Sequence, residues 1–154
     1  MNNMALDMQK STWIGDLNVP VNKELSTDVL IVDNENDYSL LLGTYLQSKG
    51  YSVMSVDGGS EAKQTLSQQT VRMVIASYEI ADLNGLKLIS HLQNDSLRWT
   101  PSILMAREHH EHLYELAKSA GALTLLYKPF PFEDVLALVQ RTLGEPVQPS
   151  SEQA

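Results

Sequence analysis

Five short strand-like runs alternate with stretches of helical periodicity, and this alternation constrains the fold more than any other feature of the chain. The runs cover residues 29–32, 51–56, 73–76, 103–105 and 123–127, and all but the second are strongly apolar. A helical pattern follows each run, over about residues 36–49, 60–68, 85–94, 113–120 and 131–142. Strands that alternate with helices of this length predict a parallel sheet with helices on both faces.

The expected fold class is therefore α/β, a doubly wound five-stranded parallel sheet of the flavodoxin-like (βα)5 type. Right-handed crossovers leave few topologies, and the more polar second run suits a sheet edge, which favours the strand order 2-1-3-4-5. Sites in such sheets form at the carboxyl ends of the strands, beside the switch point between strands one and three. Asp33, Asn34 and Ser77 follow or close these strands, and Lys128 follows the fifth.

The chain divides into one domain and two flanking segments. The domain is expected over residues 27–143, because 154 residues with 43% hydrophobic content are enough to build a core. Residues 1–26 are predicted to be an N-terminal extension, mostly mobile, in which Trp13, Ile14 and Leu17 are the candidates for docking on the body or on a partner. Residues 144–154 are predicted to be a disordered tail or a linker.

Charge and composition exclude several classes of function. The net charge of −8 disfavours contact with phosphate backbones, so no direct nucleic-acid binding is expected. The chain has no cysteine, which excludes disulfides, thiol catalysis and zinc–thiolate sites. No apolar stretch approaches the ~20 residues that span a bilayer, and the first ten residues lack the features of a signal peptide. We therefore expect a cytoplasmic protein without membrane contact.

Several short motifs at the strand ends match a known family. Residues 29–33 read Val-Leu-Ile-Val-Asp, Gly85 lies eight residues after Ser77, Gly121-Ala122 precedes the fifth strand, and Lys128-Pro129-Phe130 follows it. Together these motifs resemble the receiver domains of response regulators (CheY-like), over about residues 27–143. The resemblance implies a cis peptide bond between Lys128 and Pro129. It also implies that Asp33 stands at the first acidic position of a phosphorylation pocket.

The chain departs from this family in the residues that carry its chemistry. In receiver domains an aspartate at the position of Ser77 accepts a phosphoryl group. The other departures are Asn34 for a metal-binding acid, Ala81 for a proline, Ala106 for the Ser/Thr that binds the phosphoryl group, and Leu125 for the switch aromatic. Asp33 and Lys128 remain, and we expect them to form an ion pair. The resemblance thus implies a degenerate pocket, a "pseudo-receiver".

The replaced groups remove the usual reaction. An acyl phosphate cannot form on Ser77, and its hydroxyl is a poor nucleophile without an adjacent base. Magnesium prefers hard anionic oxygens, whereas Asn34 offers a neutral amide oxygen and Glu79 is expected to offer its backbone carbonyl. We therefore expect weak or no Mg²⁺ binding, no cofactor, and no enzymatic activity. No G-x-S-x-G elbow surrounds Ser77, and the four histidines are expected on helix three or at the start of helix four, away from it.

The sequence leaves two functional hypotheses. The first is an atypical response-regulator receiver domain in two-component or phosphorelay signalling, which binds proteins independently of phosphorylation. Its partner would be a signalling protein, an output domain or a homodimer mate, bound through the face of helix four, strand five and helix five. The alternative is a module that binds a nucleotide or flavin, against which the acidic, glycine-free loop 34–38 argues. Trp99 is expected to be a packing cover rather than a binding residue.

Overall fold

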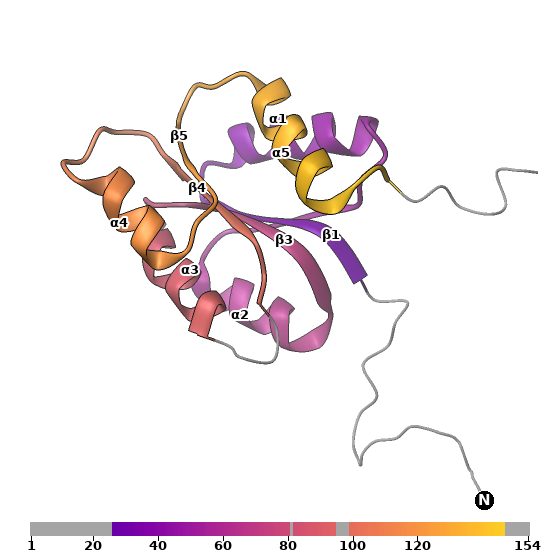
Figure 1. The fold of residues 1–154 in the computed structure, drawn as a ribbon. Helices are drawn as coiled ribbons and strands as arrows, with labels where there is room; N and C mark the ends of the chain where they lie inside the picture. Colours follow the sequence, from indigo (N-terminus) through magenta and orange to yellow (C-terminus); the bar gives the residue numbers. More distant parts are fainter. Residues whose placement is uncertain (1–25, 81, 95–98, 147–154) are drawn as a thin grey trace, which may run out of the picture.

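A computed structural model describes residues 26–80, 82–94 and 99–146, and it contains one parallel sheet of five strands with helices on both faces (Figure 1). The strand order is β2-β1-β3-β4-β5, as predicted. The strands are β1 (Ser26–Val32), β2 (Val53–Val56), β3 (Thr70–Ser77), β4 (Ser102–Ala106) and β5 (Leu125–Tyr127). The helices are α1 (Asn36–Ser48), α2 (Gly59–Gln68), α3 (Gly85–Asn94), α4 (Leu113–Ala120) and α5 (Phe132–Leu143).

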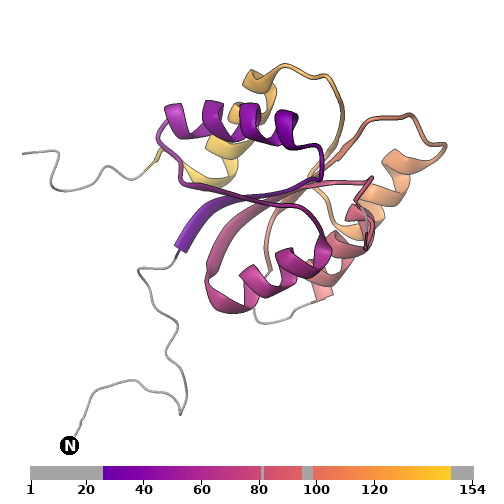
Figure 2. The ribbon, with the colours of Figure 1, turned by 180° about the vertical axis from the view of Figure 1, so that it is seen from behind.

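The central strands are apolar on both sides because the sheet lies between two layers of helices. Figures 1 and 2 show α1 and α5 over one face and α2, α3 and α4 over the other. In β1, Val29 and Ile31 join the core cluster beneath α1 and α5, whereas Leu30 and Val32 join the cluster on the α2 and α3 side. This two-sided burial accounts for the continuous apolar run of β1, since alternate side chains of a strand point to opposite faces.

Strand β1 begins at Ser26, before the apolar run that predicted it. Ser26 and Thr27 pair in parallel register with Thr70 and Val71 of β3. Backbone pairing needs no apolar side chain, so hydrophobic periodicity underestimated the strand. Ser26 therefore belongs to the domain and not to the extension, whereas residues 1–25 and 147–154 lie outside the described residues. The predictions of a mobile extension and a disordered tail fall mainly on those segments.

Helix α4 begins at Leu113, as the helical pattern predicted, and the histidine-rich segment lies before it. His109, His110 and His112 were expected at the start of this helix, but they lie in the loop before it. His112 immediately precedes the helix with φ of 64°, a left-handed conformation that few non-glycine residues adopt. Trp99 is also not the packing cover that was expected, because it is 60% exposed. Within the described ranges, no helix is both long and apolar enough to cross a membrane.

Candidate functional site

Parallel register brings the carboxyl ends of four strands together. Val32 of β1 pairs with Ala76 of β3, and Ala106 of β4 pairs with Tyr127 of β5. Consequently Asp33, Ser77, Ala106 and Lys128 meet at one edge of the sheet, as the topology predicts. Asp33, Ser77 and Ala106 are buried there.

Lys128 forms an ion cluster with two carboxylates of the β1–α1 segment. Its Nζ lies 2.7 Å from Asp33 Oδ2 and 2.7 Å from Glu35 Oε1. The side chains of Lys128 and Asp33 are only 5% and 1% exposed. The backbone N–H of Glu35 donates to Asp33 Oδ1 at 3.1 Å, which fixes the carboxylate in place. The expected Asp33–Lys128 pair is present, and Glu35 is an additional partner that the sequence analysis missed.

The residues at this edge do not fit a magnesium ion. Of the carboxylates at this edge, those of Asp33 and Glu35 already bind the Lys128 ammonium group, and that of Glu79 accepts two backbone N–H groups of the β4–α4 loop. Asn34 is exposed, and Ser77 supplies a neutral hydroxyl where the metal prefers anionic oxygen. Across the residues that the structure describes, no group of three or more His, Cys, Asp or Glu side chains is arranged to hold a metal ion.

Glu79 connects the β3–α3 loop to the β4–α4 loop through its side chain. Its Oε1 accepts the backbone N–H of Arg107 at 3.0 Å, and its Oε2 accepts that of Glu108 at 3.3 Å. His110 Nε2 lies 3.4 Å from Oε2, and Ser77 Oγ lies 3.4 Å from Oε1. The sequence suggested a role for the Glu79 backbone carbonyl and did not predict these contacts of its side chain. We call this arrangement the Glu79 latch.

Opposing effects act on the pKa of Glu79, and the net effect lowers it. Burial favours the neutral carboxyl group and raises the pKa. The backbone N–H groups of Arg107 and Glu108 and the His110 side chain stabilise the carboxylate, and together they outweigh burial. The Glu79 latch is thus anionic at neutral pH.

The neighbours of Ser77 do not activate its hydroxyl as a nucleophile. In a Ser–His–acid relay, the imidazole contacts the serine hydroxyl and the carboxylate lies behind the imidazole. Here the order is reversed, because Glu79 lies between Ser77 and His110. No histidine was expected near this strand end, and that prediction was wrong. The β4–α4 loop brings His110 into contact with Glu79, and the centroid of the His110 ring lies 4.7 Å from that of the Tyr78 ring. A carboxylate with a lowered pKa is also a weak base.

Two further contacts hold the β3–α3 loop in place. A Cβ atom at Gly85 would lie 2.3 Å from the carbonyl oxygen of Ser77, so this close approach requires glycine. On the other side, Asp82 accepts the backbone N–H groups of Gly59 and Ser60 at 2.8 and 3.0 Å, at the start of α2. The backbone N–H groups of Ser60 and Gly59 lower the pKa of Asp82 to about 2.

Comparison with known proteins identifies the family. The model of the response regulator receiver domain matches residues 29–140. The chain belongs to this family. Among curated relatives, the transcriptional regulatory protein CrdR of Helicobacter pylori is 28% identical over 113 residues, covering 72% of this chain and 53% of CrdR. The transcriptional regulatory protein GltR of Pseudomonas aeruginosa is 28% identical over 116 residues, covering 75% and 48%. The receiver domain thus spans about half the length of these relatives.

Solved structures agree with the fold. A putative response regulator from Chloroflexus aurantiacus superimposes with a TM-score of 0.71 at 22% identity, over 78% of this chain and 99% of that one. The chemotaxis protein CheY4 of Vibrio cholerae gives 0.69 at 25% identity, over 77% and 99%. This fold agrees with the receiver-domain family of two-component signalling that the family model assigns to residues 29–140.

Two further positions that the sequence analysis singled out, Ala106 and Leu125, are apolar. Ala106 is fully buried and offers no hydroxyl group at the end of β4. Leu125, at the position of the switch aromatic, is partly buried against the cluster that contains Ala106. The Lys128–Pro129 peptide bond is cis. Ala81 lies outside the described residues.

Proposed function

We propose that this receiver domain is a protein-binding module that accepts no phosphoryl group and has no enzymatic activity. The observation that carries the proposal is the Glu79 latch, which supplies a carboxylate to the backbone N–H groups of Arg107 and Glu108. Lys128, the cationic side chain of the pocket, is likewise bound by two carboxylates. An incoming anion would have to displace these carboxylates from their donors.

Electrostatics oppose such a displacement. A phosphoryl group at Ser77 would stand next to the Glu79 carboxylate, whose Oε1 lies 3.4 Å from the Ser77 hydroxyl. Two like unit charges 4 Å apart repel by about 4 kcal/mol at an effective dielectric constant of about 20. Ser77 also cannot form the acyl phosphate of the family, and Ala106 lacks the hydroxyl that would bind the phosphoryl group.

The partner surface that we propose is the face of α4, β5 and α5. Tyr114 and Leu123 are large apolar side chains exposed on this face, and they line a cavity of about 240 Å³ between α4 and β5. Because a ligand shifts an equilibrium only by differential affinity, regulation without phosphorylation depends on partner concentration or on another modification. We propose a kinase, an output domain or a second copy as the partner, in the cytoplasm.

The absence of phosphotransfer is tested by intact-mass spectrometry after incubation with Mg²⁺ and acetyl phosphate. The wild-type protein is expected to gain no phosphoryl mass. Ser77→Asp shows whether the missing carboxylate alone explains this result, and Ser77→Asp with Glu79→Ala also removes the latch. A stoichiometric phosphoryl adduct on the wild-type protein would contradict the proposal.

The partner surface is tested by copurification with two matched variants. Tyr114→Ser removes an exposed aromatic side chain from α4, whereas Leu40→Ser removes a comparably exposed apolar side chain from α1, outside the proposed face. We expect Tyr114→Ser to lose bound protein and Leu40→Ser to retain it. Loss of the same partner only with Leu40→Ser would place the interface on α1 instead.

A further inference from the structure

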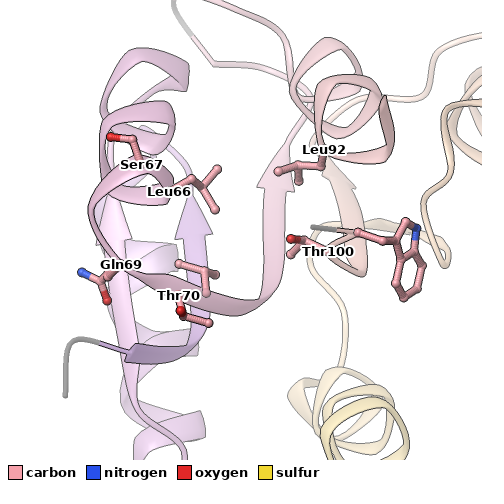
Figure 3. Close-up of a pocket in the computed structure, with 8 residues that line it drawn as sticks. Leu66, Ser67, Gln69, Thr70, Leu92 and Thr100 are labelled. Atoms are coloured by element: carbon pink, nitrogen blue, oxygen red, sulfur yellow. The ribbon is translucent and has the colours of Figure 1, made fainter. Parts of the chain in front are cut away.

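A second concave site lies at the opposite end of the sheet from the Glu79 latch. It is a cavity of about 470 Å³ between α2 and α3, within the range of about 300–1,000 Å³ typical of ligand sites. Figure 3 shows Leu66 of α2 and Leu92 of α3 pointing toward each other across it. Thr70, which also lines it, is the first residue of β3, whereas Ser77 is the last. Thr70 and Ser77 are seven positions apart along β3, and at about 3.3 Å per residue this separates the cavity from the Glu79 latch by roughly 23 Å.

The lining of this cavity favours an apolar, uncharged occupant. Its apolar contacts come from both helices and from the strand ends, through Leu66, Val71, Leu92 and Trp99. Among the described residues that line it, none is charged, so it offers no counter-ion for a phosphate or a metal.

Two of the polar side chains that line the cavity already have partners. The Ser67 hydroxyl donates to the Gln64 carbonyl, and the Gln69 amide accepts from Thr27 and donates to the Met54 sulfur. An occupant would therefore gain little from hydrogen bonds with these groups and would bind mainly through apolar contact.

The chain that precedes β1 enters the domain at the edge of this cavity. Ser26 and Thr27 pair with Thr70 and Val71, and both of these β3 residues line the cavity. Residues 13–21 read Trp-Ile-Gly-Asp-Leu-Asn-Val-Pro-Val, with a single charged residue. At about 3.3 Å per residue, Leu17 reaches up to ~30 Å from Ser26 and Trp13 up to ~43 Å, more than the distance to any part of an adjoining cavity.

We propose that residues 13–21 of this chain dock in the cavity, with an apolar anchor from Trp13, Ile14 or Leu17 between Leu66 and Leu92. An indole docked there would bury about 150–250 Å² of surface. Tethering at its edge gives the segment an effective concentration on the order of 1 mM, so an intrinsic Kd of ~0.1 mM keeps it docked about 90% of the time. A free ligand or a second chain would have to compete with this tethered segment. The proposal does not depend on the state of the phosphorylation pocket.

Intrinsic fluorescence of the full-length chain tests the docking, because Trp13 and Trp99 are its only tryptophans. Trp99→Phe leaves Trp13 as the sole reporter, and acrylamide quenching measures its exposure. Ser67→Arg, on the cavity rim, is expected to raise the quenching constant severalfold, to that of a free peptide of residues 1–25. Gln68→Arg adds the same charge to an exposed neighbour on α2 that does not line the cavity, and it is expected to leave the quenching unchanged.

A second measurement keeps Trp99 in place and identifies the occupant. The chain has no cysteine, so Asn18→Cys carries a single spin label. Docking broadens the amide signals of Leu66 and Leu92 independently of protein concentration. Trp13 quenching equal to that of the free peptide, together with unbroadened Leu66 and Leu92 signals, would overturn the proposal. Broadening that appears only on mixing labelled with unlabelled chains would overturn it in favour of a second copy.

Discussion

Removal of the Glu79 carboxylate is the perturbation that bears most directly on the architecture of the pocket. Glu79→Ala leaves the backbone N–H groups of Arg107 and Glu108 without their acceptor and frees His110 from its contact. We expect the β4–α4 loop to lose its attachment to the β3–α3 loop, while the sheet beneath it stays intact.

The loss of stability expected for Glu79→Ala follows from the hydrogen bonds that the substitution removes. A hydrogen bond to a charged group contributes about 1.5–3 kcal/mol when it is well shielded. Arg107 and Glu108 are exposed residues, so water replaces part of the lost interaction. We therefore expect Glu79→Ala to lower the free energy of unfolding by about 1–2 kcal/mol in total. For a domain of this size, that corresponds to a fall in Tm of roughly 3–6 °C.

Urea denaturation measures the loss of unfolding free energy in Glu79→Ala, and amide hydrogen exchange measures the loosening of the β4–α4 loop. Exchange at Arg107 and Glu108 should accelerate in Glu79→Ala more than exchange in the central strands. Glu111→Ala is the matched control, because Glu111 is a carboxylate of the same loop that is 87% exposed and contacts only His112 among the interactions described. Stability within a few tenths of a kcal/mol of wild type, with unchanged exchange at both amides, would refute the latch.

The pH dependence of the latch has a defined sign. The hydrogen bonds to Glu79 lower its pKa in the folded protein, against the opposing effect of burial. A lowered carboxyl pKa contributes stability that is fully present above the unfolded-state value and is lost as the pH falls through the folded-state value. The stability difference between wild type and Glu79→Ala should therefore be constant near neutral pH and shrink below about pH 4.5. A difference that shrinks between pH 6 and 8 instead would show that another group controls it.

Three further predictions concern the ion pair and the loops. Lys128→Ala leaves Asp33 buried without its counter-ion and should cost about 3–5 kcal/mol of unfolding free energy in urea, whereas additional replacement of Asp33 by Asn should recover part of it. Full additivity of the two substitutions would count against the pair. Gly85→Ala forces a methyl group against the backbone of Ser77 and should lower the free energy of unfolding, measured by thermal denaturation, by ~1–3 kcal/mol. Gly43→Ala, in α1, places its methyl group at ordinary contact distances and should be neutral or stabilising by up to ~1 kcal/mol. The Asp82 carboxyl carbon should titrate by NMR with a midpoint of about 2, so its stabilisation of α2 persists above pH 4 and is lost as the pH falls through 2. A midpoint at its ordinary value of 3.8 would contradict this contact.

The fold was predictable because its information is local. The apolar run Val29–Val32 requires burial on two sides, and a sheet covered by helices on both faces is the arrangement that provides it. The Asp33–Lys128 pair was predictable for a related reason, since parallel strands bring their carboxyl ends to one edge and opposite charges there attract. The start of β1 at Ser26 was missed because backbone pairing with β3 leaves no trace in side-chain periodicity.

The Glu79 latch was not predictable because it depends on the path of a loop. Three of the histidines were expected at the start of helix four, whereas they lie in the loop before Leu113, where His112 has a positive φ and the backbone N–H groups of Arg107 and Glu108 face Glu79. The sequence shows only that Glu79 is an acidic residue two positions after the end of β3, and this does not specify where its side chain points. Glu35 was missed in the same way, since it meets Lys128 from 93 positions away in the chain.

The amide signals of Arg107 and Glu108 provide the most direct test of the central claim, that a carboxylate of the protein already holds the anion-binding donors of the pocket. The measurement is a titration of ¹⁵N-labelled wild-type protein with Mg²⁺ and beryllofluoride, a mimic of the phosphoryl group. We predict that neither amide shifts in the wild-type protein, because Glu79 retains both donors. A saturable shift of both amides in the wild-type protein would show that the pocket accepts a phosphoryl-like anion, and it would contradict this claim.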